Sequence, residues 1–368
     1  MDLATLMNPH LGRCLDTIIM TTRAEIPEGH VGAVFDRERG AVSDSYGLVT
    51  GTAAARRTRT RQERVMIGLG VRVPGGPLEI LRLPAPRHPG RGELTMDVIA
   101  AGIGPWDALL HTGGWDVDLE PPGALGVEGV GQISETGPGE TEYRVGDVVM
   151  VHEAPLPGGS GTWAEKVLVR STSVALVPAG LPTATAAALP VAGLTALQSL
   201  DDLQVGAGTR LLVVGASGPT ASLAVQLAHH RGAEVVAGAG PDHANRLRAF
   251  GASEVVDTHV DGWAGRMHRC FDAVLIAATG TAEAALTVIS DGGRLTSITL
   301  DAPQPTRGIT TNNLYVRPDG RALDDLAALA ASGALRLDVR VTSVQDGIPI
   351  ADEVAAGRSG GVKHVLEL

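Results

Sequence analysis

The residues of this chain best suited to chemistry are two glycines that follow a short apolar run. Residues 211–214 are all Leu or Val, and Gly215 and Gly218 come close behind them. Glycine allows a tight turn and a close approach of backbone to phosphate, and the amides that open a following helix can bind a pyrophosphate. The strict G-x-G-x-x-G pattern is absent, since Ala221 closes the turn. We therefore predict a dinucleotide site whose cofactor contacts are Gly215, Ala216, Ser217, Gly218, Pro219 and Thr220.

The elements around these glycines must hold the turn in place. Residues 211–214 are typical of a buried strand, and residues 221–228 carry apolar side chains at helical spacing. A second helix is predicted at 244–250. Further strands are predicted at four places, 232–239, 255–256, 271–277 and 293–298. Strands that alternate with helices of this length indicate an α/β fold built on a doubly wound parallel sheet.

Length and composition limit the classes of protein. The 368 residues suffice for about two domains, because a domain has ~100–200 residues. The hydrophobic share of 44% is that of a globular protein. No apolar segment approaches the ~20 residues that cross a membrane, and the amino terminus shows no secretory signal. We therefore expect a cytoplasmic protein with no membrane contact.

The charge of the chain argues against nucleic acid as a partner. The formal net charge is -11, whereas a general nucleic-acid binder is basic. One basic run, residues 56–61, could be an arm for nucleic acid or acidic lipid. No aromatic residue interleaves this run, so a solvated linker is the simpler interpretation. Residues 1–65 are treated as an N-terminal extension, either a linker or disordered.

Short motifs occur in a recognisable order on both sides of the turn. Before it they are GGPLEIL (75–81), PGRGE (89–93), GIGPWD (102–107), GVEGVG (126–131), VGDVV (145–149), GTWAE (161–165) and AAALPVAGLTA (186–196). After it they are RPDG (317–320), SGAL (332–335) and VKHVL (362–366). In this order they resemble the medium-chain dehydrogenase/reductase superfamily, specifically its zinc-free quinone oxidoreductase and enoyl reductase branch.

The resemblance implies a domain plan. A Rossmann doubly wound parallel sheet is inserted in a GroES-like β-rich catalytic domain. Residues 66–190 are then the first part of the catalytic domain, residues 191–305 the Rossmann NADP-binding domain, and residues 306–368 a segment that returns to the catalytic domain. Relatives are often homodimers paired through the edge of the Rossmann sheet, so a homodimer is expected.

Departures from the family pattern bear on the metal. Zinc enzymes of the superfamily resemble this layout but place a Cys near Gly104 and a His at Val127. The whole chain has two cysteines and no cluster of metal ligands at the spacing of a tetrahedral site. No metal is therefore expected. Without a Lewis acid, hydride addition to a conjugated double bond or a quinone is favoured, because a few hydrogen bonds can hold the charge that develops on oxygen.

The cofactor prediction rests on the residues after the second strand. NAD sites place an Asp or Glu there, whereas this chain has no acid before Asp242. NADP(H) fits better. By resemblance His243 stands where related reductases carry a Lys, and with Arg246 it could hold the 2′-phosphate. A solvated helix face is the alternative for both residues, and Asp242 would repel the phosphate if it turned inward.

Candidates on the substrate side are fewer. Asp107 is the nearest ionisable group and is proposed as catalytic, although an Asp that opens a short helix at 107–111 is more often a cap. Thr195 is the second catalytic candidate, since by resemblance it contacts the nicotinamide. Asn312 is expected to border the cofactor, with turn formation as the alternative. Glu128 is expected to be structural, in a tight turn.

Two functions of different classes remain open. The first is a zinc-independent NADPH-dependent oxidoreductase that transfers hydride to an activated double bond or a quinone of a small-molecule substrate. The second is an NADP-binding protein with lost or altered catalysis that acts through structure or partners, because relatives commonly have Asn at Gly104 and some have a Tyr at Pro105. A zinc-free alcohol dehydrogenase is a narrower alternative.

Overall fold

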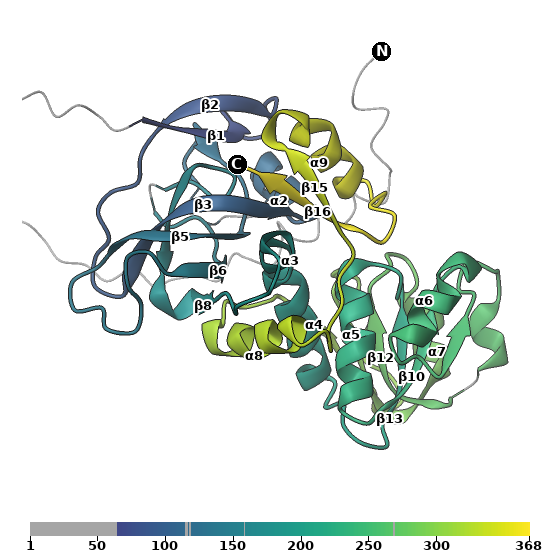
Figure 1. Cartoon of the computed structure of the whole chain (residues 1–368). Helices are drawn as coiled ribbons and strands as arrows, with labels where there is room; N and C mark the ends of the chain where they lie inside the picture. Colours follow the sequence, from purple (N-terminus) through teal and green to yellow (C-terminus); the bar gives the residue numbers. More distant parts are fainter. Residues whose placement is uncertain (1–64, 115–116, 118, 158, 268) are drawn as a thin grey trace, which may run out of the picture. The chain divides into compact units, whose positions relative to one another are not determined.

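The computed structural model describes residues 65–368 except 115–116, 118, 158 and 268. The predicted N-terminal extension therefore lies outside the described residues, except for Val65. Two lobes can be followed in Figure 1, one rich in antiparallel strands and one built on a parallel sheet. We call them the β-rich lobe and the parallel-sheet lobe.

Two sheets make up the β-rich lobe. The smaller has the order β2-β1-β4. The larger has the order β15-β16-β3-β5-β6-β8, and β7 also pairs with β3. These strands are β1 (Val65–Val71), β2 (Glu79–Pro84), β3 (Glu93–Ile103), β4 (Gly123–Ala124), β5 (Glu128–Thr136), β6 (Val148–His152), β7 (Lys166–Arg170), β8 (Val174–Leu176), β15 (Val339–Ser343) and β16 (Lys363–Glu367). Strand β16 lies beside β3 although the two are far apart in sequence (Figure 1).

The parallel-sheet lobe has the strand order β11-β10-β9-β12-β13-β14. All its pairs are parallel, as predicted from the alternation of strands and helices. The strands are β9 (Arg210–Val214), β10 (Glu234–Gly238), β11 (Glu254–Val256), β12 (Phe271–Ile276), β13 (Ile289–Ser297) and β14 (Thr310–Asn313). The sheet is doubly wound, and it is inserted between parts of the β-rich lobe, so the predicted fold class is confirmed.

Helices occur in both lobes. They are α2 (Asp107–Thr112), α3 (Thr183–Ala188), α4 (Pro190–Asp202), α5 (Pro219–His230), α6 (Ala244–Ala249), α7 (Ala282–Val288), α8 (Gly320–Ala331) and α9 (Gly347–Ala355). One apolar cluster includes Met150 of β6, Leu194 of α4 and Leu211 of β9. The lobes therefore share a continuous core, which fixes α4 between them.

Sheet membership corrects two expectations. Strand β14 belongs to the parallel sheet, so the chain returns to the β-rich lobe after Asn313 rather than after residue 305. Pairing with β13 makes residues 310–313 a strand, because four polar residues in a row show no apolar alternation that would predict one. Glu128 begins strand β5 and does not lie in a tight turn.

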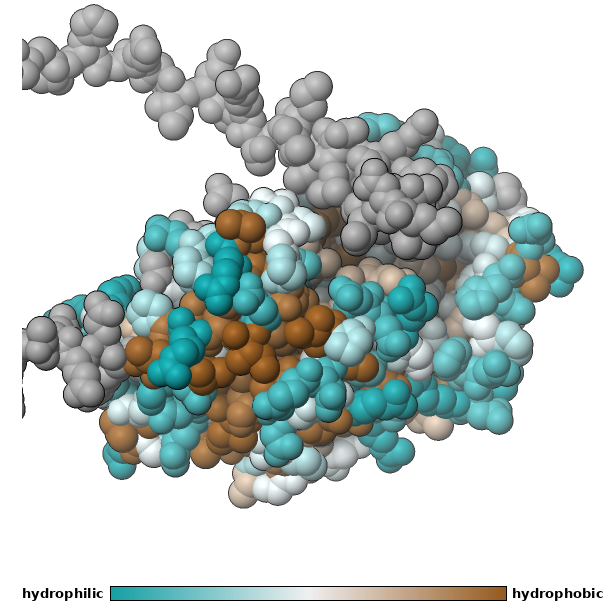
Figure 2. Space-filling model, turned by 90° about the horizontal axis from the view of Figure 1, so that it is seen from above, coloured by the Kyte–Doolittle hydropathy of each residue, from teal (hydrophilic) through white to brown (hydrophobic). Residues whose placement is uncertain are grey.

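On the face seen from above, apolar side chains, drawn brown, gather over the β-rich lobe, and polar side chains, drawn teal, border them (Figure 2). Val73 and Ile80 of this lobe are among the exposed large apolar side chains. Among the described residues, no helix is both long and apolar enough to cross a membrane.

Candidate functional site

The glycine-rich turn lies at the carboxyl end of β9, where ligands bind in doubly wound sheets. Gly215 has φ of +79°, and a Cβ there would lie 2.8 Å from the carbonyl carbon of Ala277. Its amide and that of Ala216 both donate to the Gly238 carbonyl at 2.9 Å. Only glycine meets both demands at position 215, because a side chain would be strained by φ and blocked by β12.

Space remains open at the start of α5. A Cβ on Gly218 would meet only the Gly215 carbonyl, at 3.6 Å. Pro219 takes the first helical position, and the amides of Thr220 and Ala221 belong to the first turn, which has no intrahelical acceptor. An approaching phosphate would find unpaired donors and the positive end of the helix dipole.

Residues after β10 occupy the next position along the same edge. His243 ends a short 3-10 helix and is half-buried. Arg246 donates to the Ser217 carbonyl at 2.5 Å and pairs with Asp338. The guanidinium of Arg246 therefore connects Ser217 of the glycine-rich turn to Asp338, the residue that precedes β15.

On the other side of the turn, a polar network ends β13. The hydroxyls of Ser297 and Thr299 donate to Asp301 at 2.8 and 2.7 Å, and the Gly280 amide donates to its other oxygen at 2.9 Å. Leu300, between them, has φ of +61°, a strained value for this residue. This network was not predicted from the sequence, although a Thr and an Asp just after a predicted strand are a usable signal.

Asn312 lies farther along the sheet. Strand β14 is three strands from β9, and Asn312 lines a separate cavity of about 460 Å³ with Asp202 of α4. Asn313 accepts a hydrogen bond from the Ala302 amide at 2.9 Å. The structure thus places Asn312 away from the glycine-rich turn.

Asp107 is buried at the start of α2, with 3% of its surface exposed. It does not cap the helix, because its carboxylate instead accepts from the Gly104 amide at 2.8 Å. Its other oxygen has no partner. Burial raises the pKa of Asp107 to about 8, against the hydrogen bond from Gly104 and the charge of Lys363. The carboxyl therefore keeps its proton at neutral pH.

Trp106 fills the space beside Gly104. A Cβ on Gly104 would lie 2.1 Å from two carbons of the indole ring, so this ring occupies the place of a side chain at position 104. The indole N–H is buried without a partner. The ammonium of Lys363 lies 4.5 Å from the ring centroid, within the range of a cation–π contact.

A buried ion pair joins distant parts of the chain beside this ring. Lys363 of β16 pairs with Glu128 of β5, and it also donates to the Ile103 carbonyl at 2.9 Å. The second oxygen of Glu128 accepts from the Val191 amide at the start of α4, at 2.8 Å. Burial raises the pKa of Glu128 and the Lys363 charge opposes that shift. The pair thus connects the β-rich sheet to the helix that joins the lobes.

His152 lies directly opposite Glu128 in the β5–β6 pair, so both side chains project from the same face of the sheet. One ring nitrogen is 3.1 Å from the Val127 carbonyl and the other is buried without a partner. Burial lowers the pKa of His152, which favours the neutral ring. His152 and Lys363 were not predicted as site residues, because both lie within strands and far from Asp107 in the sequence.

The predicted residues thus fall into separate groups. Gly215 to Thr220 form one turn, with Arg246 behind it. Asp107 joins a buried cluster with Glu128, His152 and Lys363 in the β-rich lobe. Thr195 is 8% exposed, on the helix α4 that begins beside that cluster.

Positions 104 and 127 hold no metal ligand, and Val127 is fully buried in an apolar cluster. Across the described part of the chain, no group of three or more His, Cys, Asp or Glu side chains is arranged to hold a metal ion.

Comparison with known proteins agrees with this architecture. Residues 90–179 match the family described as the alcohol dehydrogenase GroES-like domain. The solved quinone oxidoreductase of Coxiella burnetii superposes with a TM-score of 0.73 at 23% identity, covering 83% of this chain and 100% of that one. The chain therefore shares the fold of this quinone oxidoreductase, and residues 90–179 match the alcohol dehydrogenase GroES-like domain. The predicted resemblance and fold are confirmed at this level.

Curated relatives of this chain include much longer proteins. The pikromycin polyketide synthase component PikAII of Streptomyces venezuelae is 34% identical over 225 residues, which are 57% of this chain and 6% of that protein. A mycocerosic acid synthase-like polyketide synthase of Mycobacterium tuberculosis is 33% identical over 244 residues, which are 62% of this chain and 11% of that protein. The chain therefore spans only a small part of the length of these synthases.

Proposed function

We propose that the chain is a zinc-independent, NADPH-dependent reductase that transfers hydride to an activated carbon–carbon double bond or to a quinone. The observation that carries the proposal is the turn at Gly215, with open space at Gly218 and unpaired amides at the start of α5. The likeness to polyketide synthases and to a quinone oxidoreductase supports the reductase class. A cytoplasmic location is part of this proposal.

The orientation of the cofactor follows from the strand order. In doubly wound sheets the ribose of the adenosine half lies at the end of the second strand, which here is β10. The nicotinamide half would then lie toward β12 and β13, the strands on the other side of β9. His243 would hold the 2′-phosphate, and Thr195 and the Thr299–Asp301 network would border the nicotinamide.

The chemistry divides between cofactor and protein. When bound, the reduced nicotinamide supplies the hydride. The amides of α5 bind the pyrophosphate, and Arg246 holds the turn at Ser217 in place. Asp107 retains its proton at neutral pH and is the acid nearest to the Gly104 turn. Lys363 provides positive charge that favours an oxygen developing negative charge.

A panel of enones, enals and quinones tests the proposal, with loss of NADPH absorbance as the measurement. We expect turnover with at least one class and a lower KM for NADPH than for NADH. A preference of about tenfold for NADH would remove the 2′-phosphate assignment. Turnover of alcohols with NADP⁺ alone would identify the zinc-free dehydrogenase instead.

The second candidate function, nucleotide binding without catalysis, is favoured by one observation. The Trp106 ring fills the place of a side chain at Gly104, where relatives commonly carry Asn. Tight NADPH binding in a titration, with no turnover across the substrate panel, would support this candidate and exclude the reductase.

A further inference from the structure

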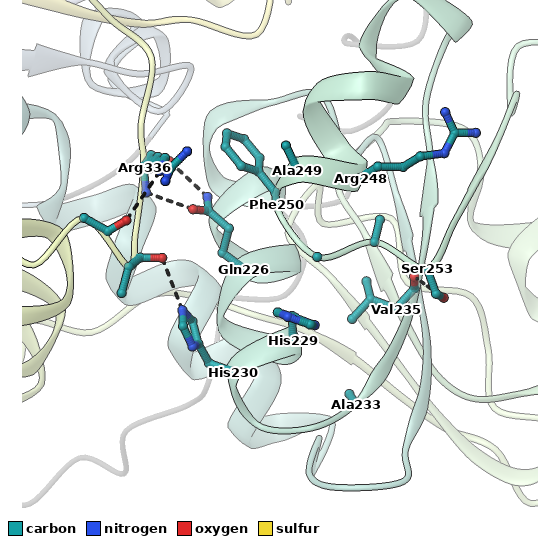
Figure 3. A pocket seen from close by; sticks show the side chains of 14 residues that line it. Gln226, His229, His230, Ala233, Val235, Arg248, Ala249, Phe250, Ser253 and Arg336 are labelled. Carbon is teal, nitrogen blue, oxygen red and sulfur yellow. Dashed lines mark hydrogen bonds between the residues drawn. The ribbon is translucent and has the colours of Figure 1, made fainter.

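A second cavity lies at the opposite edge of the parallel sheet from the glycine-rich turn (Figure 3). Its volume is about 610 Å³, within the ~300–1,000 Å³ of small-molecule sites. Its walls are the carboxyl end of α5, the first residues of β10, the end of α6 with the loop to β11, and the turn after α8. We call it the α5–α6 pocket.

Basic side chains surround this pocket. His229 and His230 lie on one side and Arg336 lies across from them, whereas the guanidinium of Arg248, another lining residue, points away from these three (Figure 3). None of the lining residues is acidic, although the chain as a whole has a net charge of -11. Among the described residues, neither His229 nor Arg248 has a hydrogen-bond or ion-pair partner. Arginine guanidinium groups and imidazole N–H groups around an open cavity provide the donors that an anion requires.

Two features keep the pocket in shape. The buried side chain of Gln226 accepts from the Arg336 amide at 2.8 Å and donates to its carbonyl at 2.9 Å, which fixes the backbone beneath the guanidinium. Gly251 has φ of +101°, and a Cβ there would lie 2.3 Å from the His229 ring. A glycine at 251 is therefore required for His229 to stand where it does. Phe250 and Val235 add apolar surface.

A short chain of contacts connects the pocket to the glycine-rich turn. Arg336 is two residues from Asp338, and Asp338 pairs with Arg246. The Arg246 guanidinium lies 5.7 Å from the ring centroid of Phe250, a pocket residue, and donates to the Ser217 carbonyl of the turn. A ligand that holds Arg336 and Phe250 in place thereby also holds Arg246 beneath the turn.

We propose that the α5–α6 pocket binds a small organic phosphate and that its occupancy tightens binding of the nucleotide cofactor. The phosphate group contacts Arg336, His229 and His230, and the apolar part of the ligand lies on Phe250. The effect on the cofactor rests on the proposed function, whereas the binding of phosphate does not. Coupling of this kind is reciprocal, so the cofactor tightens phosphate binding by the same factor.

Calorimetry on the full chain without cofactor tests the pocket, with phenyl phosphate and inorganic phosphate as probes. We expect phenyl phosphate to bind more tightly than inorganic phosphate, because only the former covers Phe250. Arg336→Gln should weaken binding about tenfold, since a charge-assisted contact is lost. Arg321→Gln is the matched control, because Arg321 is exposed on α8 and does not line the pocket.

Titration with NADPH, in the presence and absence of phenyl phosphate, tests the coupling. We expect the Kd for NADPH to fall about fivefold or more when the pocket is filled. Asp338→Asn should leave phosphate binding intact and abolish this change, because it breaks the link to Arg246.

Three results would overturn the proposal. The first is that phenyl phosphate does not bind, and the second is that it binds equally to the Arg336 and Arg321 variants. Either result would show that the basic side chains only complement the carboxyl ends of α5 and α6. Binding without any change in NADPH affinity would overturn the coupling. If phosphate binds through Arg336 but NADPH does not bind at all, the proposed function fails while the pocket stands.

Discussion

At the scale of single residues, the buried carboxyl of Asp107 has the largest consequence. An ordinary Asp ionises near pH 4, whereas burial raises the pKa of Asp107 to about 8. Between these values the unfolded chain releases the proton and the folded chain keeps it. The neutral carboxyl therefore makes its full contribution to the free energy of unfolding below about pH 4. Between about pH 4 and pH 8 this contribution falls by about 1.4 kcal/mol per pH unit, and above about pH 8 it falls no further.

Asp107→Asn tests this titration. The amide oxygen of Asn can still accept from the Gly104 amide, but the side chain no longer ionises. We expect the variant to gain stability relative to the native protein as the pH rises from about 4 to about 8. Urea unfolding of both proteins across this range measures the difference. A constant difference would mean that Asp107 is already ionised in the folded protein at low pH. A loss of reductase turnover by this variant, with the fold retained, would support the role of Asp107 as acid.

Residue types alone could not predict how the Gly104 region is built. The sequence identifies Asp107 as an ionisable group near Gly104, and the structure places it there. The environment of that carboxyl depends on Lys363, which is 235 residues from Glu128 in the sequence and reaches the cluster through β16. Likewise, the sequence shows only that Gly104 lacks the side chain that relatives commonly have. The structure shows that the indole ring of Trp106 fills that space. Long-range packing of this kind leaves no local pattern.

At the scale of elements, the β9–turn–α5 unit depends on close approach to β12. Gly215→Ala introduces a Cβ that is disfavoured by φ and meets the Ala277 backbone at 2.8 Å. Gly208→Ala is a matched control, because Gly208 has φ of +82° and open space around its Cβ position. We expect the Gly208 variant to lose about 1 kcal/mol of stability and to keep its nucleotide affinity.

The Gly215 variant should bind NADPH at least about tenfold more weakly, because the turn must move to admit the methyl group. Fluorescence titration with NADPH measures both variants. Equal affinities would show that the turn does not form the pyrophosphate site.

Most elements of the parallel sheet could be predicted because their signals are local. Residues 271–277 are apolar, glycine precedes β10 at Gly232, and α5 carries its apolar residues at helical spacing. Pairing with neighbouring strands determines where some strands begin and end. The sequence alone therefore could not predict the polar strand β14 or the ends of β3 and β13. The network of Ser297, Thr299 and Asp301 was not predicted either, although Thr299 and Asp301 directly follow the strand predicted at 293–298.

At the scale of the whole molecule, the expected homodimer can be tested at β14, the edge strand of the parallel sheet among the described residues. The Leu314 amide donates to Ser297 of β13, so the amides of residues 311 and 313 point away from β13. Thr311→Pro therefore removes one donor at the free edge and leaves the bonds to β13 intact. Light scattering during gel filtration should show a dimer for the native protein and a larger monomer fraction for the variant. A native protein that remains a monomer at high concentration would contradict the proposed homodimer.

The ion pair between Glu128 and Lys363 also orders events during translation. Glu128 leaves the ribosome 235 residues before its cation, a delay of tens of seconds at ~5–20 residues per second. The whole parallel sheet is synthesised in that interval. Strand β16, which brings Lys363, also inserts between β15 and β3. The nascent β-rich lobe thus gains its missing inner strand and its counter-ion in one late step, after the parallel-sheet lobe has had time to fold.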